Sequence, residues 1–280
     1  MSPKATLAIA LDLLREAAAR RWFLALGIAI TAIVVVLGLA LRMEVVDGAL
    51  AATRLFGTVV NHDIRSAEGV MQHVFEALAY VIFYGGLVFG VLACSDFGPD
   101  LLSPGRIEHL LALPIRRTEL LAGTYLGVLT LSVVGALYGA GAFTLLVSFK
   151  SGVWTARPIL AALLASATFS TLYGAMLTSA LFVRSAALSG AIGGALLVAG
   201  IVAGRRDDLA PLFDEGLSRS AFLAVTAFLP RVSHLANASA DLASSHPVDV
   251  VLLVRSLVGL AAFGLGCLAI GMWQFERKDF

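Results

Sequence analysis

Residues 22–41 read WFLALGIAITAIVVVLGLAL, a run that contains no charged side chain. A helix needs about 20 apolar residues to cross the hydrocarbon layer of a membrane. The chain contains five more apolar runs, at residues 74–93, 120–147, 158–183, 186–203 and 250–273. The run at 186–203 is marginal in length and the others are long enough. The pattern therefore predicts six membrane-spanning helices.

The composition favours the same class. The chain has 280 residues, of which 59% are apolar and 14% are charged, whereas soluble domains carry about 25% charged residues. Membrane-spanning strands alternate in polarity over about 10 residues, and these runs do not alternate. The first run is longer than the roughly 7 to 15 apolar residues of a cleaved signal peptide. We expect an all-α membrane protein with a single transmembrane domain over residues 1–280.

Several functional classes lack their signatures. The net charge of +1 gives no indication of a nucleic-acid partner, which normally requires a clustered basic face. Cys94 and Cys267 do not suggest a disulfide framework. The five histidines have neither zinc-site spacing nor an HExxH pattern. We expect no metal site and no cofactor bound by this chain.

Basic residues suggest the orientation. Six spans place both termini on one side, together with the segments around residues 94–119 and 184–185. These segments hold ten Lys and Arg residues, and the longer segments on the other side hold nine. Since basic residues are denser near span ends on the cytoplasmic side, the sequence predicts cytoplasmic termini. We expect a bacterial cytoplasmic (inner) membrane.

Residues 1–21 precede the first span and predict an amphipathic interfacial helix. Leu7, Leu11, Leu14 and Ala18 recur at spacings of three and four, which places them on one helical face. Such a helix lies along the membrane surface. An ordinary helical tail is the alternative.

Glycines recur at helical spacing in two runs. A spacing of four returns to nearly the same helix face, and small residues there let helices approach closely in lipid. Close packing is the simpler interpretation, and a sliding surface in a moving transporter is the alternative. The residues concerned are Gly123, Gly127, Gly135, Gly139, Gly190 and Gly194.

Two further features lie on the other predicted side. Residues 204–249 form a long extracytoplasmic segment, whose apolar stretch before Pro230 predicts a short or re-entrant helix. Glu76 and Arg255 lie at similar shallow depths in their spans. Both side chains can reach the interface; the alternative is a functional ion pair that lines an exit pathway.

The segment 103–114, SPGRIEHLLALP, is a charged interruption between two oily runs. Ser103 is expected to cap a short helix with Pro104 in its first position, and Pro114 is expected to end it. Thr118 is expected to cap the next helix, with Glu119 near its positive end. The helix could dock a cytosolic protein or serve as a passive connector.

The stretch GRIEHLLALPIRRTELLAGTYLG resembles the first cytoplasmic loop of type-2 ABC transporter permeases. The start, REAAARRWFLAL, and the end, FERKDF, are similar to that family's entry into its first span and its C-terminus. The layout is also similar to the copper-site maturation permeases of nitrous oxide reductase. The family's acidic residues before the glycine are represented here only by Asp96 and Asp100.

The resemblance implies the permease subunit of an ABC exporter, with residues 103–114 as its coupling helix. The chain lacks a Gly-x-x-x-x-Gly-Lys-Ser/Thr loop, so ATP and Mg would be held by a separate ATPase subunit in two copies. A second permease chain, identical or related, would complete the exporter, and the substrate would be membrane-borne. The residues implied in coupling are Gly105, Arg106, Ile107, Glu108, His109, Leu110, Leu111, Pro114, Arg116 and Arg117.

Two other functional classes remain alternatives. An ion-gradient-driven transporter usually has polar residues at the membrane centre and inverted repeats. An intramembrane enzyme needs a cluster of catalytic side chains at that depth. Neither signature is clear in this sequence.

Overall fold

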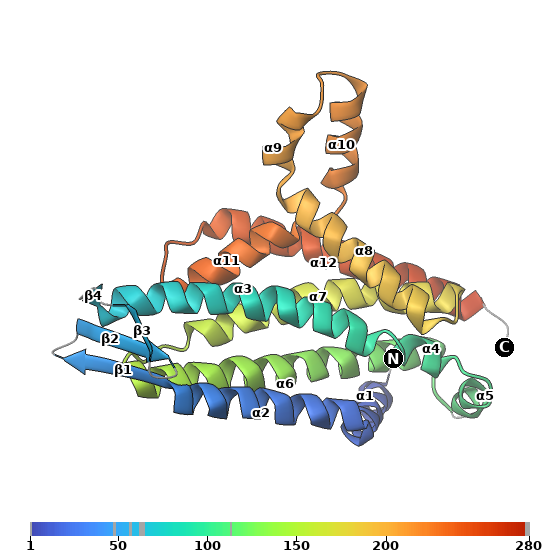
Figure 1. Cartoon of the computed structure of the whole chain (residues 1–280). Coiled ribbons are helices and arrows are strands. Elements are labelled where there is room, and N and C mark those ends of the chain that lie inside the picture. The colour runs from blue at the N-terminus through green and yellow to red at the C-terminus, as the bar shows by residue number, and fades with distance from the viewer. Residues whose placement is uncertain (1, 47–48, 56–57, 62–64, 113, 278–280) are drawn as a thin grey trace.

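The chain forms a bundle of long helices with both termini toward one end (Figure 1). The computed structural model describes residues 2–46, 49–55, 58–61, 65–112 and 114–277. We call the end that holds α1 and α5 the terminal end, and the opposite end the sheet end. The helices, with one 3-10 turn, are α1 (Pro3–Ala19), α2 (Arg21–Ala40), α3 (Ala67–Cys94), α4 (Phe97–Leu101), α5 (Arg106–Leu111), α6 (Arg117–Ser151), α7 (Arg157–Phe182), α8 (Ala186–Gly204), α9 (Arg206–Leu209), η1 (Ala210–Leu212), α10 (Leu217–Ala227), α11 (Val232–Ser244) and α12 (Val250–Arg277).

Six helices in the described part of the chain are long and apolar enough to cross a membrane. They are α2, α3, α6, α7, α8 and α12. Each contains one of the six predicted apolar runs, except that α2 and α7 end one residue before their runs do. This confirms the prediction of a largely helical, multi-pass membrane protein.

A small sheet departs from the all-helical expectation. Strands β1 (Leu41–Val46), β2 (Ala49–Leu55), β3 (Thr58–Asn61) and β4 (Arg65–Ser66) form an antiparallel sheet. β1 and β3 flank β2, and β4 also pairs with β2. The sheet joins α2 to α3 at the sheet end (Figure 1). Outside the apolar core of a membrane, strand edges can be solvated, so a sheet is compatible with this connection.

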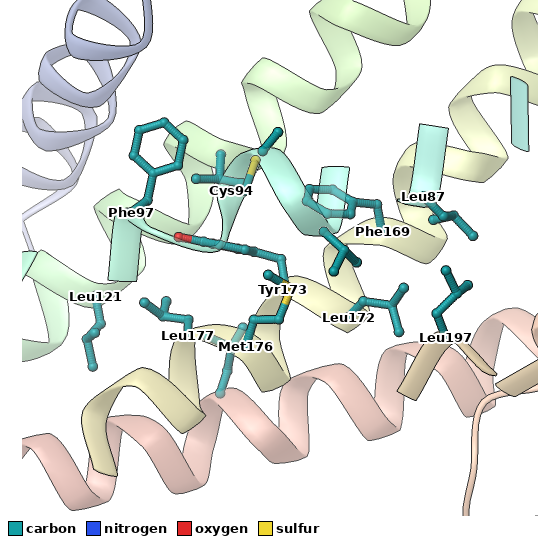
Figure 2. Close-up of a cluster of buried hydrophobic side chains, with 14 of the residues drawn as sticks. Leu87, Cys94, Phe97, Leu121, Phe169, Leu172, Tyr173, Met176, Leu177 and Leu197 are labelled. Atoms are coloured by element: carbon teal, nitrogen blue, oxygen red, sulfur yellow. The ribbon is translucent and has the colours of Figure 1, made fainter. Parts of the chain in front are cut away.

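Helix α7 is the centre of the bundle, since 72% of its apolar window is buried. Its neighbours include α3, α6, α8, α11 and α12. Figure 2 shows Phe169, Tyr173 and Met176 of α7 among side chains from neighbouring elements, including Cys94 and Leu197. Tyr173 and Met176 are almost completely buried.

Hydroxyl groups join α7 to its neighbours. Thr171 Oγ1 donates a hydrogen bond to the Leu260 carbonyl at 3.2 Å, and Thr178 Oγ1 donates one to the Cys267 carbonyl at 2.7 Å. Gly264 of α12 approaches so closely that an added Cβ would lie 3.2 Å from the Thr171 Cα. In lipid, small residues and such hydrogen bonds drive helix association because the surrounding tails are as apolar as leucine.

Helix α1 packs against α6 through a different face from the predicted stripe. Its buried residues are Thr6, Ala10, Leu13 and Ala17, whereas Leu7 and Leu11 are exposed. Thr6, Ala10 and Ala17 are small enough to allow a close approach to α6, whereas Leu7 and Leu11 face away from the protein. The spacing of apolar residues in the sequence identified an apolar face of α1, but a different face packs against α6.

The glycine pattern divides into packed and open positions. A Cβ added to Gly123 or Gly127 would lie against α1, and one added to Gly190 would lie 3.2 Å from Ser95 Cβ. A Cβ added to Gly135 or Gly139 would meet no atom within 4 Å. Gly194 is equally open.

Residues 204–249 form two distinct parts. α9, η1 and α10 project from the bundle, whereas α11 lies along it (Figure 1). α10 contains the apolar stretch before Pro230, and Leu217 and Phe228 at its ends are highly exposed. α11 buries Leu235, Ala236 and Ala240 against the bundle.

Gly123→Ala should destabilise the protein by about 1–3 kcal/mol because of overpacking. The new Cβ would lie 2.6 Å from Ile9 Cβ and 2.9 Å from the Thr6 carbonyl oxygen. Gly135→Ala on the same helix is the matched control and should be neutral or stabilising by about 0.5–1 kcal/mol. Thermal unfolding in detergent, followed by tryptophan fluorescence, measures both. Equal losses in the two variants would contradict the assignment of Gly123 to the α1 contact.

Candidate functional site

The charged segment between α3 and α6 folds into α4 and α5 at the terminal end (Figure 1). Ser103 Oγ donates to the Asp100 carbonyl at 2.8 Å, so its hydroxyl closes α4. The predicted cap at Ser103 is wrong: Gly105 precedes α5, with φ +82°. This left-handed conformation strains residues with a side chain, which explains the glycine. α5 is shorter than the predicted 103–114 helix.

Helix α5 has one attached face and one free face. Ile107 is only 2% exposed, and Leu110 packs against the same core. Glu108 and His109 are exposed. The side chain of Leu111 and all of Leu113 lie outside what the structure describes. A surface of α5 is therefore available at the tip of the terminal end.

Arg20 binds three carboxylates from two parts of the chain. Its guanidinium bonds to Glu16 and to Asp100 at 2.8 Å each, and also to Asp96. The guanidinium also lies 4.4 Å from the centre of the Phe97 ring. A planar group with five donors suits this multiple contact, which a lysine ammonium would not reproduce.

The Arg20 side chain is 17% exposed. Burial acts to lower its pKa, but hydrogen bonds to Glu16, Asp96 and Asp100 outweigh burial and raise the pKa above the ordinary arginine value. Arg20 therefore fixes the beginning of the α4 segment to the end of α1.

Glu16 connects Arg20 to α5. Its second carboxylate oxygen accepts a hydrogen bond from Arg106 at 2.6 Å. The bond from Arg106 is the main cause of a lowered Glu16 pKa; burial opposes it, and Arg20 reinforces it. Glu16 thus joins two arginines, one directly after α1 and one on α5. We call Glu16, Arg20, Asp96, Asp100 and Arg106 the charged joint.

A hollow of about 250 Å³ lies beside the charged joint. Elements α1, α4, α5 and α6 contribute its lining, which includes Glu16, Arg106 and Leu110. α5 is therefore held partly by ion pairs and partly by Ile107 and Leu110, with space behind it.

The start of α6 is tied to both ends of the chain. Arg116 rather than Thr118 precedes the helix, and Glu119 accepts hydrogen bonds from the backbone N–H groups of Arg116 and Ser2. Arg117 donates to the carbonyl of Phe275 at 3.2 Å and to that of Glu276 at 3.4 Å. These are terminal carbonyls of α12, where a cation is favourable.

The three segments that carry the family resemblance therefore meet at the terminal end. The loop contacts α1 through Arg106 and contacts α12 through Arg117. Pro114 and Arg116 are exposed. Residues 278–280, which complete the C-terminal motif, lie outside the described residues.

Sequence reasoning assigned no role in the site to Glu16 or Arg20, and treated Asp96 and Asp100 only as remnants of an acidic run. Their signal was the rarity of charge: 14% of the chain is charged, and these residues adjoin span ends. Pattern alone did not reveal that they face one another.

The Glu76 and Arg255 positions do not form an ion pair in the described structure. Glu76 instead lies 3.7 Å from His73 Nδ1, and Arg255 is exposed. A search of the described residues finds no group of three or more His, Cys, Asp or Glu side chains placed to hold a metal.

No protein-family model matches the chain, and a search of curated proteins finds no significant match.

Arg20→Gln should loosen the segment 97–111 from α1. Hydrogen bonds to charged groups contribute about 1.5–3 kcal/mol each, so we expect amide hydrogen exchange in this segment to accelerate by at least roughly tenfold. Mass spectrometry of exchanged peptides measures it. Arg15→Gln is the matched control because Arg15 is an exposed arginine on α1, one turn before Arg20. Similar exchange in both variants would show that the charged joint does not hold the segment.

Acidification should release α5 from α1. The pKa of Glu16 is lowered from its ordinary value of 4.5, so its ion pair with Arg106 contributes fully above that pH and is lost as pH falls through the lower folded value. Exchange in α5, corrected for its intrinsic pH dependence, should rise below about pH 4.5. Glu16→Gln should show fast exchange at neutral pH and a much smaller pH response. An unchanged pH response in Glu16→Gln would exclude Glu16 as the titrating group.

Proposed function

We propose that this chain is the membrane-spanning permease subunit of an ATP-driven exporter of the type-2 ABC class. Two permease chains, identical or related, would work with two copies of a separate ATPase that binds ATP and Mg. The terminal end would face the cytoplasm of a bacterial cell, and the substrate would be membrane-borne. The proposal combines the loop resemblance with the contacts of that loop.

The observation that carries the proposal is the attachment of α5. Arg106 on α5 is bonded to Glu16 of α1 at 2.6 Å, and Ile107 is buried. Glu108 and His109 on the same short helix remain exposed. A helix held on one face and free on the other is suited to transmit a push from a docked protein.

Contacts of α5 would transmit this force to the membrane-spanning helices. α5 connects through Glu16 and Arg20 to the end of α1, which leads directly into α2 at Arg21. Asp96 and Asp100 link the same joint to the end of α3. Closure of an ATPase dimer against α5 would therefore apply force to α2 and α3 at the same time.

A ligand shifts a conformational equilibrium only by its difference in affinity for the two states. In this proposal, ATP changes the preferred separation of the two ATPases, and α5 converts that preference into a preferred arrangement of the spans. The Arg117 contacts with Phe275 and Glu276 would carry the same change to α12.

The first test is copurification. The full-length tagged chain, extracted from its native membranes, should bring with it an ATPase that has a Gly-x-x-x-x-Gly-Lys-Ser/Thr loop. ATP hydrolysis in the complex should be higher than in the ATPase alone. Isolation of the chain with no such ATPase, under conditions that preserve other membrane complexes, would count against the proposal.

Glu108→Arg should abolish the copurification or the stimulation of hydrolysis, because it reverses a charge on the free face of α5. Glu215→Arg is the matched control: its side chain is 94% exposed and lies between η1 and α10. Both variants should insert into membranes normally. Full ATPase stimulation by Glu108→Arg would remove α5 from the docking role.

A further inference from the structure

Helix α2 stands apart from the bundle along most of its length. No residue of its apolar window, Phe23–Ala40, is buried, whereas most of the α7 window is. The hydroxyls of Thr31 and Tyr138 bond α2 to α6. On the side toward α3, α2 leaves a wide gap.

That gap is a half-open groove of about 890 Å³, lined by α2, α3, α6 and α7. Its volume lies within the range of about 300–1,000 Å³ that is usual for ligand pockets. Leu24 and Ile33 of α2, Val81 of α3 and Val134 of α6 are exposed lining residues. Gly90, Cys94 and Phe169 line it and are buried or packed on one another.

The lining is almost entirely apolar. Ser132, Tyr138 and Ser166 contribute its hydroxyl groups, and the hydroxyls of Tyr138 and Ser166 already form hydrogen bonds within the protein. Apolar cavities stay dry, and an empty cavity forfeits van der Waals contact for every atom that lines it. The groove therefore favours an apolar occupant over water.

Five glycines in this groove do not serve helix packing. Gly27, Gly85, Gly86, Gly135 and Gly139 all line it, and a Cβ added to any of them would meet no atom within 4 Å. By contrast, α1 packs directly against Gly123 and Gly127 of α6. The bare backbone of these five positions widens the groove.

The groove has the length of a lipid chain. Along α2 its lining extends from Phe23 to Leu37, roughly 21 Å at the helical rise. One leaflet of the hydrocarbon core is about 15 Å thick. A complete acyl chain can therefore lie in the groove, and the surrounding bilayer supplies it through the open side.

We propose that the groove between α2 and α3 binds one acyl chain of a membrane phospholipid. The proposal stands on the groove and is independent of any ATPase partner.

The test uses the full-length chain in phosphatidylcholine vesicles that contain a small fraction of phosphatidylglycerol with a photoactivatable diazirine on its acyl chain. Peptide mass spectrometry should find adducts concentrated on the facing sides of α2, α3 and α6. Adducts spread evenly over the lipid-facing sides of all the helices would overturn the proposal.

Gly86→Leu and Gly135→Leu should lower groove labelling by at least roughly fivefold, because each places a side chain in the path of the ligand. Gly194→Leu and Gly259→Leu are matched controls, with equally open positions outside the groove lining, and should leave labelling unchanged. If all four variants fold and labelling is unchanged in both groove variants, the groove is not the binding site.

A disulfide between two copies of Gly135→Cys would place a neighbouring chain in the groove, and would overturn the lipid assignment altogether.

Discussion

Arg20 is the side chain on which the terminal end depends. Its guanidinium holds Glu16, Asp96 and Asp100, and Glu16 in turn holds Arg106 of α5. Without Arg20, three carboxylates would face one another across the junction of α1 and α4. Breaking a partly buried charge network by removing one member is costly, because the remaining charges lose their partners. The connection between the surface helix and the spans therefore rests on electrostatics in an otherwise apolar protein.

The bundle itself is held by a different device. Hydroxyls on α7 bond to carbonyls of α12, and glycines let backbones approach closely. These contacts are effective in lipid because burying a leucine against another helix gains little over burying it in acyl chains. The same physics accounts for α1, which turns its small residues to α6 and leaves Leu7 and Leu11 outside. It also accounts for α2, which makes few such contacts and borders a groove.

The sequence indicated where the candidate site lies, but it did not reveal which side chains contact one another there. Pro114 and the charges of residues 103–117 mark an interruption between apolar runs, and this correctly indicated a structured loop. The cap was wrong because Ser103 bonds backward to Asp100, a local alternative that spacing does not distinguish. The contacts of Arg20 with Asp96 and of Arg117 with Phe275 join residues more than 75 positions apart, beyond the reach of periodic patterns.

The sequence by itself determined the six membrane-crossing helices, since each span needs about 20 apolar residues and the bilayer permits only helices or closed barrels. It also determined that charge would concentrate between the spans. Only the tertiary structure decided which glycines are packed and which are open, which face of α1 is buried, and which charges meet. Those outcomes depend on how the helices are placed around α7. A repeating sequence pattern indicates which face of a helix is apolar, but it does not indicate which other helix that face contacts.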